Sequence, residues 1–407
     1  MRLAPRRAFW VWLHRWVGLA MAGFLLIIGL TGSLLAFYPE LQRLANPHWY
    51  PDRAPAQWLS PGELAARVEA AEPRVRVTML QRPGFEGATR AWFVPRTDPA
   101  SGKPFDVADE FVILDPASGQ VLDRGRWGGI GSGLRFIVDF VYELHYSLAL
   151  GMTGVWILGI LALLWTIDCF FGAYLTLPPR PNARRGFWAR WAPAWKVKAG
   201  AGAWRLNFDL HRAGGLWPWA MLLVFAWSSV YMNLWDTVYT WSMRAVSDFR
   251  PPWVLQVPLP QPLEQPPLDW REAQARAEQL LQAQAREHGF RAGRGVSIQY
   301  DGESGSYTYQ ADSSLEIADR PRRYMAQVIF DARSGELQHL LLPRGQYAGN
   351  TVSNWLYALH MGNVFGLPYR VFVCVLGLVI AMLSVTGVVV WWHKRRARRR
   401  AQAVSAA

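Results

Sequence analysis

Four apolar runs constrain this 407-residue chain more than any other feature of its sequence. A helix needs about 20 apolar residues to cross a hydrocarbon core of ~30 Å, and each run is close to that length. The first run follows several arginines, as in a secretory signal, but it is long and lacks an Ala-x-Ala cleavage site, so we interpret it as a retained membrane helix. The predicted spans are Trp16–Tyr38, Val155–Leu177, Leu216–Leu234 and Val371–Trp392.

The basic residues gather in three short segments beside these runs. Residues 1–15, 178–210 and 394–407 hold 17 of the 43 lysines and arginines and a single acid, Asp209. The formal charge of +13 therefore comes from these segments, and the rest of the chain is slightly acidic. Because positive charge marks the cytoplasmic side of membrane helices, we expect both termini and the middle loop to be cytoplasmic. This distribution removes the main argument for nucleic-acid binding.

The two long segments between the runs resemble each other. A capping box predicts a helix beginning at Ser60 in the first and at Asp269 in the second. Val112–Gly119 matches Val328–Gly335 at an offset of 216, and both end in an Asp-x-x-Ser-Gly turn. The other predicted strands follow the same order: Val75–Leu80, Ala91–Val94 and Phe111–Leu114, then Val296–Tyr300, Tyr307–Gln310 and Ala326–Phe330.

The flanks of the apolar runs repeat as well. Leu13-His14-Arg15 recurs as Leu210-His211-Arg212 at an offset of 197, and Leu144-His145-Tyr146 recurs as Leu359-His360-Met361 at an offset of 215. Two copies of helix, outer α+β module and helix therefore make up nearly the whole chain. The fold class predicted is an α-helical membrane protein, a pseudo-twofold bundle of four transmembrane helices that carries two outer α+β domains.

The repeated histidines form two predicted pairs. A twofold axis along the bundle would bring His14 to His211 on the cytoplasmic side and His145 to His360 on the outer side. Two facing imidazoles are what a six-coordinate b-type haem requires, so we expect two haems that relay electrons across the membrane. His393 could replace His14 or His211 at the inner site. The sequence has neither the Cys-x-x-Cys-His motif of covalent haem nor a nucleotide-binding Gly-x-Gly-x-x-Gly, so the reductant is expected to come from elsewhere.

Asp168 is the only acid deep in an apolar run. It could orient a ligand histidine through the second ring nitrogen, or it could pair with Arg15 or Arg212. The outer histidines lie ten or more residues before the apolar runs, so we expect an outer haem roughly 15 Å beyond them, near the external surface. Residues beside these histidines could line a docking cleft or serve as interfacial anchors: Trp127, Arg135, Tyr142, Tyr146, Trp355 and Tyr357.

The sequence resembles the PepSY-associated transmembrane helix family in two motifs. Leu13–Leu19 followed by Gly29–Leu34 is similar to its first membrane helix, and the strand ending at Asp115–Gly119 looks like its PepSY module. The resemblance implies a multi-pass protein of the bacterial inner membrane with periplasmic PepSY domains and haem b held by His14, His145, His211 and His360. It also implies an enzyme that reduces ferric siderophores with electrons from an unidentified cytoplasmic or quinol donor. The implied divisions are 1–38, 39–135, 136–177, 178–210, 211–234, 235–355, 356–393 and 394–407, where 39–135 and 235–355 are the periplasmic domains.

Two other functions stay open at this point. The chain could be a cytochrome b subunit that feeds a separate periplasmic enzyme. It could also be a haem-free regulatory protein whose outer modules bind a protease or another partner, as the PepSY name suggests. Membrane lipid surrounds the chain in all three cases, and none of them involves nucleic acid.

Overall fold

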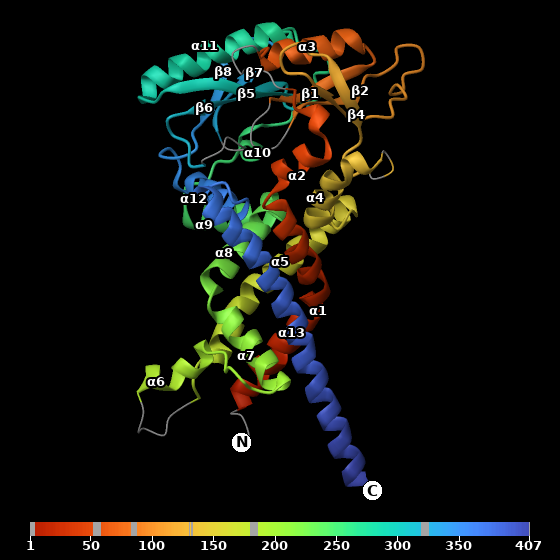
Figure 1. Ribbon diagram of the computed structural model, residues 1–407. Coiled ribbons are helices and arrows are strands. Elements are labelled where there is room, and N and C mark those ends of the chain that lie inside the picture. Colours follow the sequence, from red (N-terminus) through yellow and green to blue (C-terminus); the bar gives the residue numbers. More distant parts are fainter. Residues whose placement is uncertain are drawn as a thin grey trace.

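The computed structural model describes residues 5–51, 58–82, 88–129, 131, 133–179, 186–318 and 325–406. A bundle of long helices carries a β-sheet at one end (Figure 1). Helix α1 (Pro5–Leu35) begins and helix α13 (Gly366–Ala406) ends at the opposite end, where α6 (Phe187–Trp191) and α7 (Ala203–Leu216) also lie (Figure 1). The described parts of the three basic segments thus share one end of the molecule. We name it the basic end, and the other the sheet end.

Three described helices are long and apolar enough to cross a membrane: α1 over Arg7–Leu35, α5 (Gly151–Thr176) and α13 over Gly366–Val404. The fourth predicted span, Leu216–Leu234, is not one straight helix. It is the second part of a pair, α7 and α8 (Trp219–Asn233), bent by 68°. Pro218 causes the break, because it has no backbone N–H and its ring excludes a continuing helix. The pair counts as a fourth span only if its two parts are taken together.

Two short helices precede the second and fourth spans. Helix α4 (Ile137–Ser147) carries His145, and α12 (Ala348–His360) ends at His360. The chain then turns in the left-handed region, at Leu148 and Ala149 (φ 56° and 55°) before α5 and at Phe365 (φ 58°) before α13. Since these breaks redirect the chain, the outer histidines do not lie on straight extensions of the spanning helices. Other described short helices are α2 (Tyr38–Ala45), α9 (Thr240–Val246), α10 (Pro252–Leu255), the 3₁₀ turns Pro47–Trp49, Leu134–Phe136 and Ala192–Trp195, and the π-helical turn Trp235–Tyr239.

The strands of the two outer segments join in one antiparallel sheet of order β4-β3-β2-β1-β5-β6-β7-β8. The sequence predicts two domains, whereas the structure has two four-stranded halves that meet at β1 and β5, with Leu80 opposite Ile298. Pairing β1 with β5 satisfies backbone groups that two separate domains would each leave open at an edge. The strands are β1 (Val75–Gln81), β2 (Thr89–Pro95), β3 (Phe111–Leu114), β4 (Val121–Gly125), β5 (Ala292–Asp301), β6 (Ser306–Ser313), β7 (Ala326–Asp331) and β8 (Leu337–Leu341).

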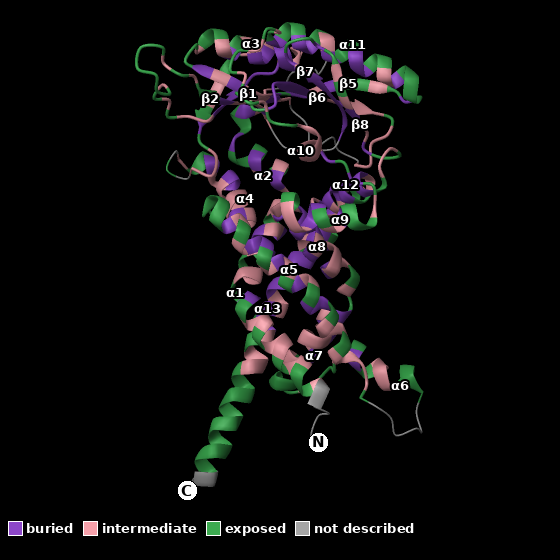
Figure 2. Ribbon diagram, turned by 180° about the vertical axis from the view of Figure 1, so that it is seen from behind, coloured by how far each residue is buried: buried purple, intermediate pink, exposed green. Residues whose placement is uncertain are grey.

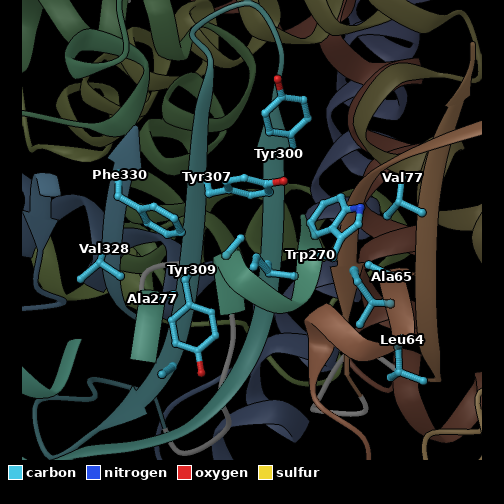
Figure 3. Packing of buried hydrophobic residues seen from close by; sticks show 14 of the residues in the cluster. Leu64, Ala65, Val77, Trp270, Ala277, Tyr300, Tyr307, Tyr309, Val328 and Phe330 are labelled. Carbon is cyan, nitrogen blue, oxygen red and sulfur yellow. The ribbon is translucent and has the colours of Figure 1, made fainter. Parts of the chain in front are cut away.

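Two helices cover one face of this sheet, α3 (Pro61–Ala71) and α11 (Trp270–His288) (Figure 1). The predicted starts are confirmed: Ser60 caps α3 through the Glu63 N–H, and Asp269 with Glu272 forms a capping box on α11. Figure 3 shows side chains of both helices meeting those of the strands in one core. Each fully buried large apolar side chain stabilises the fold by roughly 1.5–3 kcal/mol, so the two halves depend on each other through a shared core. Core residues from both halves include Leu64, Val77, Trp270, Tyr307, Tyr309 and Phe330.

The repeated turns of the two halves have the same geometry, as predicted. The Asp115 carboxylate accepts hydrogen bonds from the Ala117 and Ser118 N–H groups, and Asp331 does so from Arg333 and Ser334. A glycine with φ of 75° or 70° then closes each turn. This match supports the internal duplication.

A carboxyl group after β6 makes stability depend on pH. Glu316 accepts hydrogen bonds from the Ser313 N–H and hydroxyl, and burial raises its pKa to about 7. The folded protein then binds more protons than the unfolded chain between the two pKa values, so the free energy of unfolding falls as pH rises from about 4.5 through 7. Allowing for partial exposure, we expect a change of about 2 kcal/mol. The melting temperature of Glu316→Gln should vary less with pH than that of the wild type. The control Glu303→Gln, at an exposed position, should show the same pH dependence as the wild type. If all three proteins showed the same pH dependence, the assignment to Glu316 would be contradicted.

Candidate functional site

The structure brings the repeated histidines together in the two predicted pairs. The ring centroids of His14 on α1 and His211 on α7 are 6.2 Å apart with an interplanar angle of 51°. Those of His145 on α4 and His360 on α12 are 6.3 Å apart at 68°. We name them the basic-end pair and the sheet-end pair. Each pair joins the two halves of the chain.

In the sheet-end pair, helix hydroxyls hold both rings. The His145 Nδ1 lies 3.0 Å from the Thr31 Oγ1, and the His360 Nδ1 lies 2.7 Å from the Ser228 Oγ. Both hydroxyls donate their own protons to carbonyls of their helices, to Ile27 in one case and to Phe225 in the other. They therefore accept from the rings, which fixes the proton of each histidine on Nδ1.

The basic-end pair is held in the same way but by different groups. The His14 Nδ1 lies 2.9 Å from both carboxylate oxygens of Asp168 on α5. The His211 Nδ1 lies 3.1 Å from the Leu383 carbonyl and from the Thr386 Oγ1 on α13, and Thr386 donates its proton to its own helix. All four imidazoles thus donate from Nδ1. No Nε2 of the four is hydrogen-bonded to a described residue, so each keeps a free lone pair for a metal.

Glycines make room for the rings. A Cβ on Gly32 would lie 2.9 Å from the His145 Cε1, and one on Gly387 would lie 3.0 Å from the His211 Cε1. Such distances are closer than van der Waals contact, so any side chain here would displace an imidazole. Gly172 faces the His14 ring less tightly, at 3.6 Å.

The sheet-end pair opens on a large cavity between the helices. Its non-atom volume, open side included, is ≈ 1260 Å³. Walls come from α1, α4, α5, α8, α12 and α13, and the lining includes Gly32, Leu158, Phe225 and Gly377 beside the two histidines. The lining residues of α5 and α13 belong to spanning segments, so the site lies between the membrane helices and not roughly 15 Å beyond them. The left-handed turns after α4 and α12 explain this difference from the sequence expectation. Figure 2 shows buried and intermediate segments along the helices of the bundle, among them α5 and α8.

The residues present fit haem b. A metal–imidazole bond is about 2.0 Å long and the ring centroid lies ~1.1 Å beyond the nitrogen, so two imidazoles on opposite sides of one iron have centroids ~6.3 Å apart. The ring centroids of the two pairs are 6.2 and 6.3 Å apart. The free lone pairs of both pairs, and the cavity beside the sheet-end pair, agree with the same ligand. His14 with His211 and His145 with His360 would hold the two iron atoms.

Of the two roles open for Asp168, the structure shows contact with His14. Within the described residues neither Arg15 nor Arg212 forms an ion pair with Asp168. Arg212 instead pairs with Asp209 at 2.8 Å, and the Arg15 guanidinium lies 5.4 Å from the centre of the Trp16 ring. His393 is exposed and lies against Trp204 with ring centroids 5.0 Å apart. The ring contacts therefore favour His14 and His211 over His393 as the inner pair.

Half of the predicted docking residues lie together. The Trp127 Nε1 is 3.1 Å from the Tyr146 hydroxyl, and the Tyr142 ring contacts both, with centroids 5.6 and 5.5 Å away. Tyr142 and Tyr146 line the cavity. The other three residues lie elsewhere: Arg135 pairs with Asp123, Trp355 lies near Phe365, and Tyr357 is buried among Tyr231 and its neighbours.

Sequence reasoning proposed Asp168 as an orienting group but missed the hydroxyls that contact the other imidazoles and two of the glycines that face the rings. Thr31 and Ser228 are 197 residues apart, the offset of His14 and His211, and Gly172 and Gly387 are 215 apart, the offset of His145 and His360. Aligning the two repeats beyond the histidines, along the neighbouring helices, would have identified these hydroxyl residues and glycines.

A family model described as "PepSY-associated TM region" matches residues 11–394. No curated protein matches the sequence. The matched range contains all four paired histidines and every hydroxyl or carboxylate that holds them.

Proposed function

Since the chain belongs to the PepSY-associated TM family, we propose that it is a di-haem b oxidoreductase that reduces ferric siderophores. The observation that carries the proposal is the pair of facing histidines at each end, with every Nδ1 hydrogen-bonded and no Nε2 hydrogen-bonded to a described residue. A histidine that served only packing would have no need of this tautomer in four independent places. Bound haem would supply one-electron chemistry at both sites.

The arrangement of the chain suggests the direction and location of the reaction. By the positive-inside rule the basic end faces the cytoplasm, so the sheet end would face the periplasm of a bacterium. A cytoplasmic or quinol donor would serve the basic end. Siderophores bind Fe(III) through hard oxygen ligands, and one electron converts it to Fe(II), which such ligands hold less tightly.

The residues beside the sheet-end pair define where a ferric chelate would approach. Tyr142 and Tyr146 form part of the cavity wall, and Trp127 covers them from the side of the sheet. These rings offer flat amphipathic surfaces with polar tips, suited to a catecholate or hydroxamate chelate. We assign them to docking. No side chain needs to transfer a proton to the substrate.

An absorption spectrum of the protein purified in detergent tests this proposal. We expect a Soret band and, after dithionite, a sharpened α band, with about two haems per chain in a pyridine haemochrome assay. The excess dithionite is then removed from the reduced protein. Adding a ferric siderophore to this sample should restore the oxidised spectrum. A protein without a Soret band would instead favour a haem-free interaction role. Haem that is not reoxidised by ferric siderophores would favour a cytochrome subunit that feeds another enzyme.

A further inference from the structure

The two histidine pairs differ in the charge of the groups that orient them. Thr31, Ser228 and Thr386 are neutral, whereas Asp168 is a carboxylate that receives the His14 Nδ1 proton with both oxygens. The Asp168 side chain is only 8% exposed. The offset of 215 that relates His145 to His360 also relates Asp168 to Leu383, whose carbonyl holds His211, so the carboxylate has no charged counterpart in the other half of the chain.

A carboxylate at this position changes the electronic character of its imidazole. It draws the Nδ1 proton toward itself and makes the ring a more electron-rich ligand. Such a ligand stabilises the more positive, oxidised metal and thereby lowers the reduction potential. The effect is strong in a site of low dielectric constant, where charge interactions are weakly screened.

Nearby cations do not cancel this charge by direct contact. Among the described residues no lysine or arginine forms an ion pair with Asp168, and Arg212 is occupied by Asp209. Arg15 and Lys394 belong to the same end, and their charges oppose that of Asp168. Coulomb energy falls with distance, so the carboxylate in hydrogen-bond contact with the ligand has the larger influence on it.

We infer that Asp168 gives the basic-end site a lower reduction potential than the sheet-end site, an inference that rests on the function proposed above. A single electron would then pass from the basic-end site to the sheet-end site, which has the higher reduction potential. This transfer lowers the free energy and forms or breaks no bond. Asp168 is thus a positioning residue that gives electron flow its direction. It acts through His14 and not on the substrate.

Spectroelectrochemistry of the haem-loaded protein tests this inference. The wild type should show two components, and in Asp168→Asn the lower-potential component should move to higher potential while the other stays in place. Ser228→Ala, which removes a neutral partner, should leave the lower-potential component unchanged. The inference is overturned if Asp168→Asn moves only the higher-potential component or moves neither.

A second variant tests which site has the lower reduction potential, even if Asp168→Asn loses haem. His360→Ala should retain only the basic-end haem, and that haem should match the lower-potential component of the wild type. A match to the higher-potential component would refute the inference while the di-haem function stands. Absence of haem from the wild-type protein would refute both, so the two failures are distinguishable.

Discussion

His145→Ala and His360→Ala should each lose about half of the bound haem and all reduction of external ferric chelate, because each removes one of the two imidazoles that would hold haem at the sheet end. The remaining basic-end haem should still be reduced by dithionite. Pyridine haemochrome counting and the rate of chelate-induced reoxidation measure the two effects. His14→Ala and His211→Ala should also lose about half of the haem, but from the basic-end site, which we propose accepts electrons from the donor.

The matched control for these variants is His288→Ala. His288 ends α11 over the sheet, is exposed, and belongs to neither pair. It should keep the full haem content and the full rate. If His145→Ala or His360→Ala likewise kept full activity, the assignment of the sheet-end site would be wrong.

Gly32→Val should remove the sheet-end haem although it changes no ligand. Its Cβ would lie 2.9 Å from the His145 Cε1, and the two added methyl groups would push the ring away from His360. Overpacking of this kind lowers the stability of the folded protein by about 1–3 kcal/mol, and here it directly displaces the His145 side chain. We expect a haem content close to that of His145→Ala, whereas Gly387→Val should affect the basic-end haem through His211.

Gly23→Val provides the control on the same helix. Gly23 is exposed, and a Cβ there meets nothing within 4 Å. Both substitutions replace a glycine by valine within the same helix and so change helix propensity in the same way, so the comparison isolates contact with the ring. Equal haem contents in the two variants would show that the space beside His145 is not needed.

The histidine pairs could be predicted from the sequence because a duplication relates them. A repeat offset needs no knowledge of packing, and a twofold arrangement of equal halves brings equivalent residues together. The caps at Ser60 and Asp269 could be predicted for a different reason, because the capping-box pattern is local. The hydroxyls of Thr31 and Ser228 were missed because short polar residues in membrane helices commonly bond their own backbone, as these also do.

Other features depended on interactions that composition does not report. Counting apolar residues passes over Pro218, although a single proline bends the third span by 68°. The depth of His145 and His360 follows from left-handed turns that include Leu148, Ala149 and Phe365, residue types that do not by themselves signal such a backbone. The pairing of β1 with β5 joins segments more than 200 residues apart, and no local pattern specifies it.

That central pairing has a consequence for how the chain is assembled. When β1 emerges from the ribosome its partner β5 has not been made, and α5, α7 and α8 must enter the membrane before Ala292 is reached. With the membrane topology proposed above, the first half of the sheet would wait with an open edge on the far side of the membrane, where another strand could add to it. The pairing of β1 with β5 would therefore be a late event, which follows insertion of the helices that lie between these strands in the sequence. Conditions that delay insertion should expose β1 to proteases or to holding chaperones before they affect any cofactor.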